Sequence, residues 1–145
     1  MKKAYIAGPF FNATQFNIIE CIKAVCKQAE IQFFSPKDES MFQQGDDPKV
    51  ILDLNCKAIA SSEFLIAITD DKDIGTMWEA GFAYSLGIPI IYVWLGYKPE
   101  MKFNIMLAAS GQAVVHNYKS LHVQLMTYKH TGKFDGNLSR DMLHE

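Results

Sequence analysis

Short apolar runs alternate with amphipathic segments along the chain, and this order constrains the fold more than any other feature of the sequence. A strand–helix alternation of this kind is typical of a parallel sheet with helices on both faces. The sequence therefore predicts a single-domain α/β protein, flavodoxin-like or Rossmann-like, with a five-stranded parallel sheet. The apolar runs predict strands at residues 2–8, 31–35, 64–69, 89–95 and 112–117.

Helical periodicity fills the segments between these runs. The first helix has Asn12 or Thr14 available as its N-cap. In the second, the spacing predicts that Leu54 and Ala58 face the core. The expected helices cover residues 12–29 and 47–62, a segment ending at Gly87 before Pro89, and residues 104–111 and 120–128.

Length and charge limit the classes of function. With 145 residues the chain is expected to form one domain over residues 1–145, with residues 129–145 as either a loose end or an arm toward a neighbouring subunit. A net charge of -2 without a basic run argues against nucleic-acid binding and favours a small ligand. No apolar stretch approaches the about 20 residues that span a bilayer, so we expect no membrane insertion.

The cysteines and histidines point to no redox or metal chemistry. Cys21, Cys26 and Cys56 lie in helical patterns beside apolar neighbours, which favours reduced side chains and a cytoplasmic location. The four histidines show no ligand spacing, and the chain has no GxGxxG, phosphate-binding loop or GxSxG motif. We expect neither a metal nor a cofactor, so any chemistry falls to carboxylates.

Ligands of doubly wound sheets bind outside the carboxyl ends of the strands. The segments that follow the predicted strands are therefore the candidate site, and they contain polar, acidic and aromatic side chains. These segments are residues 8–11, 36–40, 70–79 and 96–104.

The stretch "DKDIGTMWEAGFAYSLG" at residues 71–87 holds the strongest candidate. Thr76 and Glu79 fit the S/T-x-x-E capping box, which predicts that both satisfy the first turn of a helix. A carboxylate at that position is expected to stay ionised because of the helix dipole, as a nucleophile requires. Asp73 precedes it by six residues, either as a solvated loop acid or as a second site carboxylate.

Three further side chains are candidates, each with a purely structural alternative. Asp53 lies beside Leu54 in the second helix, on a solvated face or at the rim of a cleft. Tyr5 is in the first strand, where a buried hydroxyl needs a partner and a cleft carboxylate would serve. Phe11 follows that strand, where it either packs in the core or stacks on a planar ring.

These residues together resemble the nucleoside 2-deoxyribosyltransferase family. The resemblance rests on "YIAGPFF", "LDLNCKAIASSEFLIAI", "DIGTMWEAGFAYSLGIPI" and "NIM", and it covers most of residues 4–110. The spacing of Asp53, Asp73 and Glu79, followed by two glycines, is similar to the family pattern. Leu52 departs from it, because better-known relatives carry an amide there, and Ser40 is a candidate replacement for an amide at the base edge.

The resemblance implies exchange of the base of a 2'-deoxynucleoside by double displacement. By resemblance Glu79 is the nucleophile that attacks the anomeric carbon, and a second base then attacks the deoxyribosyl ester. Asp53 and Asp73 line the base and sugar sites, with Asp53 as the proton relay, whose pKa should be raised. Tyr5 orients the nucleophile.

The resemblance also implies the binding residues and the assembly. Gly8 and Phe11 would contact the substrate, with Phe11 against the base. Asn104 and Met106 match residues that reach into a neighbouring subunit's site, which implies a homo-oligomer, either a dimer or a dimer-based hexamer. Deoxynucleosides and free purine or pyrimidine bases are the expected partners.

Two rival interpretations remain open at this point. A related N-glycosidase would cleave 2'-deoxynucleoside 5'-phosphates with water as the acceptor, but "GPFFNATQF" offers no Arg for a phosphate. A receiver-like or nucleotide-binding module would share the fold but needs an acid pair after the first strand, where "AGPF" has none.

Overall fold

The computed structural model describes residues 2–137 and 143–144. Its main sheet contains β1 (Lys3–Ala7), β2 (Gln32–Phe34), β3 (Phe64–Ile68), β4 (Ile90–Val93) and β6 (Ala113–Val115). A small second sheet pairs β5 (Phe103–Asn104) with β7 (Leu143–His144). The helices are α1 (Ala13–Gln28), α2 (Pro36–Glu39), α3 (Pro48–Ala60), α4 (Ile74–Ser85), α5 (Ile105–Ser110) and α6 (Tyr118–Thr131), with a 3-10 turn, η1 (Asp70–Lys72).

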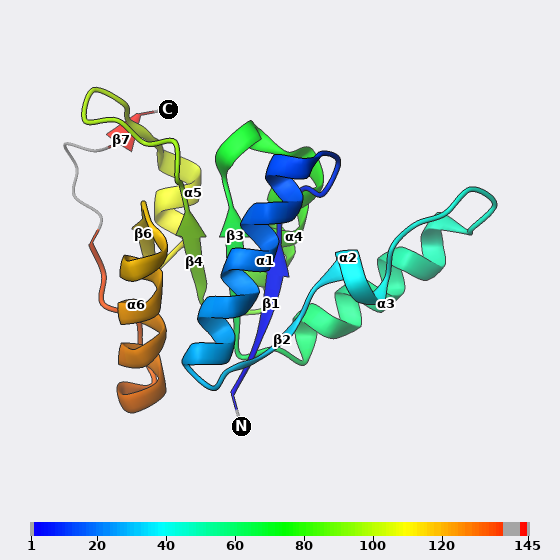
Figure 1. The fold of residues 1–145 in the computed structure, drawn as a ribbon, viewed down its shortest axis with the longest axis horizontal. Coiled ribbons are helices and arrows are strands. Elements are labelled where there is room, and N and C mark those ends of the chain that lie inside the picture. Colours follow the sequence, from blue (N-terminus) through cyan, green and yellow to red (C-terminus); the bar gives the residue numbers. More distant parts are fainter. Residues whose placement is uncertain (1, 138–142, 145) are drawn as a thin grey trace.

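The main sheet is parallel, and its five strands run in the order β2-β1-β3-β4-β6. This order confirms the predicted α/β fold and is the flavodoxin-like order. The chain adds β2 on one side of β1 and then returns to add β3 on the other side, so the order in which strands are added reverses between β1 and β3. Figure 1 shows the strands side by side, with helices in front of and behind them. A ligand site is therefore expected at the carboxyl ends of β1 and β3.

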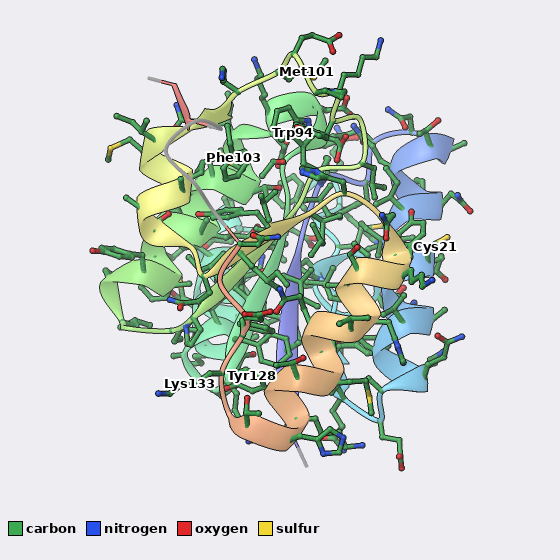
Figure 2. The ribbon with its side chains drawn as sticks, turned by 90° about the vertical axis from the view of Figure 1, so that its left-hand side faces the viewer. Cys21, Trp94, Met101, Phe103, Tyr128 and Lys133 are labelled. Atoms are coloured by element: carbon green, nitrogen blue, oxygen red, sulfur yellow. The ribbon has the colours of Figure 1, made fainter. Side chains whose placement is uncertain are left out.

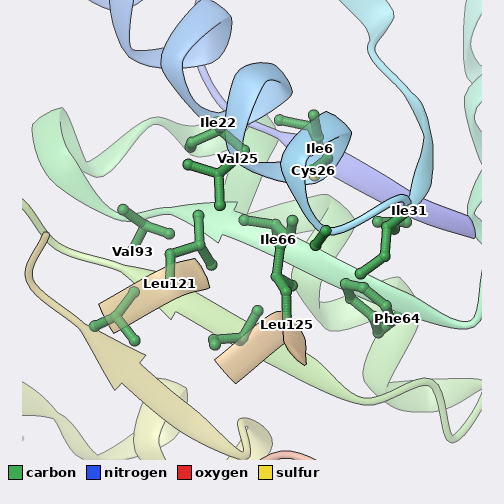
Figure 3. Packing of buried hydrophobic residues seen from close by; sticks show 14 of the residues in the cluster. Ile6, Ile22, Val25, Cys26, Ile31, Phe64, Ile66, Val93, Leu121 and Leu125 are labelled. Carbon is green, nitrogen blue, oxygen red and sulfur yellow. The ribbon is translucent and has the colours of Figure 1, made fainter. Parts of the chain in front are cut away.

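One face of the sheet is covered by α1 and α6. Ile22, Val25 and Cys26 of α1 meet Leu121 and Leu125 of α6 over the inward side chains of the central strands, as Figure 3 shows. Burial of these apolar surfaces at about 25 cal/mol per Å² is the main force that holds the two helices on the sheet. All three cysteines are free, as predicted, but only Cys26 is fully buried.

The other face is covered by α3, α4 and α5, and here one prediction is wrong. Ala58 is buried as expected, together with Ile59, but Leu54 is 40% exposed. Only the carboxyl-terminal end of α3 packs on the sheet, because its first turns project away from the domain with the loop before them (Figure 1). The periodicity of α3 is thus real, but half of its apolar face is exposed in the part of the chain that the structure describes.

Local signals account for the helix ends. Asn12 rather than Thr14 caps α1, since its side chain accepts from the Gln15 backbone N–H at 2.9 Å. Gly87 follows α4 with φ of 73°, a left-handed conformation that glycine adopts without steric cost. The sequence missed α2, β5 and β7, which are too short to show a period.

Part of the predicted tail is helical. The last helix continues to Thr131 and ends at Gly132, whose φ is 78°. Residues 133–137 then run back beside β6, where the Asn137 side chain donates to the Val114 carbonyl at 2.6 Å. The expectation of a loose end is therefore wrong for residues 129–137, and residues 138–142 and 145 lie outside the described part of the chain. Within residues 2–137 and 143–144, no helix has the length and apolarity needed to cross a bilayer.

Candidate active site

A cleft of about 410 Å³ opens at the carboxyl ends of β1 and β3. It is lined by the loop 8–11 after β1, by the segment after β2, by the outer half of α3 and by the start of α4. This is the switch point of the sheet, where the fold leaves a crevice between helices that start on opposite faces. Of the predicted site residues, the cleft brings together Gly8, Phe11, Asp73 and Glu79.

Tyr5 lies beneath the cleft and holds Glu79. Its ring is fully buried in β1 and stacks on Phe34, and its hydroxyl donates a hydrogen bond to Glu79 Oε2. Burial and the adjacent carboxylate raise the pKa of Tyr5 far above its usual value, so the hydroxyl stays protonated and acts only as a donor. Among the described residues, the second carboxylate oxygen of Glu79 has no hydrogen-bond partner, and Glu79 lines the cleft.

Burial also sets the acidity of Glu79. Desolvation raises its pKa to about 7, the hydrogen bond from Tyr5 opposes this rise, and the charge of Asp73 adds to it. The prediction that the helix dipole keeps Glu79 ionised is therefore wrong, because Glu79 is in the second turn of α4 rather than at its start. A carboxylate with a pKa near neutrality suits a group that must gain and lose negative charge during a reaction.

Asp73, and not Thr76, is the N-cap of α4. Its Oδ2 accepts from the Thr76 backbone N–H at 2.9 Å and from the Thr76 hydroxyl at 2.8 Å. The predicted capping box of Thr76 with Glu79 is consequently wrong by three residues: Thr76 is buried inside the first turn, and Glu79 is free to bind Tyr5 instead. Capping fixes the Asp73 carboxylate at the mouth of the cleft, beside Glu79.

Asp53 is not brought into the cleft. It lies on the exposed side of α3, where its carboxylate pairs with Lys49 Nζ at 3.0 Å, one helical turn away. Leu52 and Asn55, which lie close to Asp53 along α3, do line the cleft. An exposed i,i+4 pair of this kind stabilises a helix by only about 0.3–0.5 kcal/mol, so it opens at little cost.

Gly8 and Phe11 form the wall of the cleft on the β1 side. A side chain at Gly8 would overlap the terminal methyl of Ile68, so a larger residue there requires the Ile68 side chain to shift. Phe11 is 79% exposed and stacks on Phe10, with a ring-centroid distance of 6.1 Å. An aromatic ring so exposed at a cleft mouth can stack on a planar ligand.

Asn104 and Met106 lie away from this cleft, at or next to a second hollow of about 730 Å³ at the end of β4. Asn104 lines that hollow and caps α5, with its Oδ1 accepting from the Met106 backbone N–H at 2.9 Å, and Met106 is 73% exposed. Figure 2 shows the neighbouring Trp94, Met101 and Phe103 gathered at this end of the molecule, opposite Tyr128 and Lys133. Neither residue reaches the cleft of its own chain.

The cleft has few polar groups and no cation. Among the described residues that line it, none is Lys, Arg or His, and the charged side chains are Asp73 and Glu79 alone. Trp78, Ser40 and Asn55 also line it, with the Ser40 hydroxyl donating to Asn55 Oδ1 at 2.5 Å. Sequence reasoning missed Trp78 and Asn55, although Trp78 directly precedes Glu79 and Asn55 follows Asp53 by two residues.

The described residues hold no metal-binding cluster: nowhere in 2–137 or 143–144 do three or more His, Cys, Asp or Glu side chains converge in a suitable arrangement. The cleft has apolar and aromatic walls and two neighbouring carboxylates, Asp73 and Glu79. Such a lining suits a neutral, planar organic molecule.

The family comparison decides which family the chain belongs to. The family model described as nucleoside 2-deoxyribosyltransferase matches residues 4–122. The chain belongs to the nucleoside 2-deoxyribosyltransferase family. The match spans Tyr5, Asp53, Asp73, Glu79 and Asn104, and the family consists of enzymes that act on N-glycosidic bonds. A search of curated protein sequences finds no significant match.

Solved structures share the fold. A 2-deoxyribosyltransferase from Bacillus psychrosaccharolyticus superposes with a TM-score of 0.78 at 23% identity, over 94% of this chain and 99% of that one. A CMP N-glycosidase from Clostridium botulinum gives a TM-score of 0.58 at 19% identity, over 86% and 98% of the two chains. A 2-deoxyribosyltransferase from Leishmania mexicana gives 0.54 at 24% identity, over 68% of each chain.

Proposed function

We propose that the protein is a nucleoside 2-deoxyribosyltransferase that exchanges the base of 2'-deoxyribonucleosides through a 2-deoxyribosyl-Glu79 ester. The observation that carries the proposal is the Tyr5–Glu79 hydrogen bond at the floor of the cleft, which fixes one carboxylate oxygen and leaves the carboxylate aimed at the ligand space. Family membership supports the reaction class.

The proposed reaction has two inverting steps. Glu79 attacks the anomeric carbon while the C–N bond to the first base breaks, and that base leaves with a proton from an acid in the site. A second base attacks the anomeric carbon of the ester, the bond to Glu79 breaks, and the base gives up a proton, so configuration is retained overall. Neither step requires a cofactor.

Asp73 and Asp53 share the remaining roles in the proposal. Asp73 is positioned at the cleft mouth beside Glu79, and we assign it to the sugar side of the site. Asp53 is the proposed proton relay to the leaving base in the substrate-bound state, which is reached when its exposed pair with Lys49 opens. Gly8 and Phe11 are the proposed wall against the sugar and the base.

The second subunit enters the proposal through Asn104 and Met106. Both lie outside the cleft of their own chain and are at least partly exposed, so they are available to a neighbour. We propose a dimer, alone or within a hexamer, in which these residues complete the partner's site.

A related N-glycosidase acting on 5'-phosphates is the second candidate, since a solved CMP N-glycosidase shares the fold. The lining of the cleft favours the transferase, because a phosphate is normally bound by Lys or Arg and the described lining residues include neither.

An exchange assay tests the proposal. Incubation with 2'-deoxyinosine and adenine should yield 2'-deoxyadenosine, and Glu79→Gln, which keeps the size and a hydrogen-bond acceptor for Tyr5, should yield none. Release of free sugar and base without a new nucleoside would favour the hydrolase.

A further inference from the structure

Gln15 joins the loop after β1 to the turn η1, and each of these two segments leads into residues that line the cleft. It is in the first turn of α1 and only 7% exposed. The Phe11 backbone N–H donates to Gln15 Oε1 at 2.7 Å, and Gln15 Nε2 donates to Asp71 Oδ2 at 2.9 Å. Because only the amide oxygen accepts from a backbone N–H, this orientation of the side chain is fixed.

Helix capping explains the first of these two hydrogen bonds, the one from Phe11. The bond from Phe11 resembles the back-reaching bond of a capping box, in which a Gln near the third helical position satisfies a backbone N–H that precedes the helix. The bond to Asp71 leaves the helix for a loop 56 residues away, so it adds nothing to the cap. The second bond therefore calls for a different role.

The loop that receives the second bond is strained. Asp71 and Lys72 have φ of 68° and 49°, the left-handed region that non-glycine residues adopt at a cost of about 1–3 kcal/mol and only where the surroundings hold them. On its other side the loop is held by Asp70, whose carboxylate accepts from the Leu95 and Gly96 backbone N–H groups at 2.8 and 2.7 Å. Asp73 follows directly and starts the helix that carries Glu79.

We infer that Gln15 is a positioning residue that sets the distance between the loop at Phe11 and the turn before Asp73, and thereby the affinity for the base. It touches neither substrate nor reacting atoms in this role. The Tyr5–Glu79 pair is built on β1 and α4 and does not depend on it. The kinetic consequence rests on the proposed function, whereas the coupling of the two loops does not.

A polarity swap tests the inference. Gln15→Glu keeps an acceptor for Phe11 but places a carboxylate against Asp71, so the introduced side chain should repel the turn that carries Asp71. Asp71→Asn alone keeps an acceptor for Gln15, and Asn tolerates the left-handed conformation. In Gln15→Glu/Asp71→Asn the introduced amide donates to the introduced carboxylate, which restores the bond in reverse. Gln28→Glu, at the exposed end of the same helix, is the matched charge control.

The expected kinetic result is a selective change in KM. Gln15→Glu should raise KM for the acceptor base about tenfold while kcat changes less than about threefold, and the double variant should return KM to within about twofold of wild type. A variant that loses only stability would show a lower Tm with no rescue of KM by Asp71→Asn. An unchanged KM in Gln15→Glu, or a raised KM that the double variant keeps, would overturn the inference.

Amide hydrogen exchange gives a readout that needs no activity. Protection of segments 9–12 and 70–73 should fall together in Gln15→Glu, recover in the double variant and stay unchanged in Gln28→Glu. Equal protection of both segments in wild type and Gln15→Glu would overturn the coupling of the loops. If wild type exchanges no bases but the protection pattern holds, the proposed function fails and the coupling stands.

Discussion

At the scale of single residues, burial sets the chemistry of Glu79. A carboxylate removed from water binds its proton more tightly, and here the pKa rises to about 7. Since a nucleophile must be ionised, kcat/KM for the donor nucleoside should rise with pH as Glu79 ionises, with the midpoint of the rise near pH 7, until the acid that protonates the leaving base ionises as well. A profile of initial exchange rates checks this, and a rate that stays level from about pH 5 upward would contradict it.

The hydrogen bond from Tyr5 lowers the pKa of Glu79, so its removal should shift the profile in a defined direction. Tyr5→Phe should move the rise in kcat/KM to higher pH, with the largest loss of rate on the acid side. Tyr92→Phe is the matched control, because Tyr92 is equally buried and its hydroxyl bonds Ser110 rather than an acid. A shift of the same size in both variants would rule out a specific role for Tyr5.

The same raised pKa affects stability. Between its ordinary pKa and about 7, Glu79 holds more proton in the folded than in the unfolded chain, so this residue's contribution to the unfolding free energy falls as pH rises through that window. Glu79→Gln has no ionisable group at this position, so its unfolding free energy lacks this fall with pH. Its advantage over wild type in urea unfolding should grow by about 2 kcal/mol between about pH 5 and about pH 8. A constant difference would argue that Glu79 is solvated.

The sequence identified most of these residues but not their environments. Tyr5, Asp73 and Glu79 follow from strand and helix patterns, yet the capping residue of α4 was misplaced because Asp73 and Thr76 both fit an N-cap. Gln15 had no signal at all, since a Gln on an otherwise regular helix shows neither its burial nor its bond to a loop far along the chain.

At the scale of elements, Asp73 caps α4 and is also the proposed carboxylate on the sugar side of the site. Asp73→Ala should lower the unfolding free energy by about 1 kcal/mol, because the Thr76 N–H and hydroxyl lose their acceptor. Asp73→Asn keeps a capping oxygen but removes the charge, so stability should be retained and the pKa of Glu79 should fall. Chemical denaturation and the pH–rate profile separate the two effects, and equal loss of stability in both variants would contradict the capping role.

A helix or strand could be predicted from the sequence where it is long enough to show a full repeat of its apolar pattern. The five main strands and the long helices follow from apolar runs and helical spacing, with ends that differ by a few residues. Leu54 shows where the pattern fails: periodicity identifies the apolar side of α3 but not whether that side meets the sheet, solvent or another chain.

At the scale of the whole molecule, the site is proposed to need two chains. Glu79→Ala and Asn104→Ala should each exchange bases poorly. When subunits of the two variants are mixed and reassembled, activity should return, because one site of each mixed dimer has an intact Glu79 and an intact neighbouring Asn104. Size-exclusion chromatography should show a dimer or a multiple of it. Absence of complementation in a confirmed mixed dimer would place Asn104 outside the site.

The sequence indicated the position of the cleft through the carboxyl ends of the strands, but it placed Asp53 by spacing alone. In the folded chain its carboxylate lies on the outer side of α3 with Lys49. Which side of the projecting helix α3 faces the cleft depends on what α3 contacts. No local sequence pattern specifies those contacts.

The most direct test of the account is the covalent state of Glu79 during turnover. Wild-type protein quenched in acid with 2'-deoxyinosine and digested should carry a deoxyribosyl group on the peptide that contains Glu79, and added adenine should discharge it as 2'-deoxyadenosine. Base exchange with no adduct, or an adduct on another side chain, would contradict the central claim.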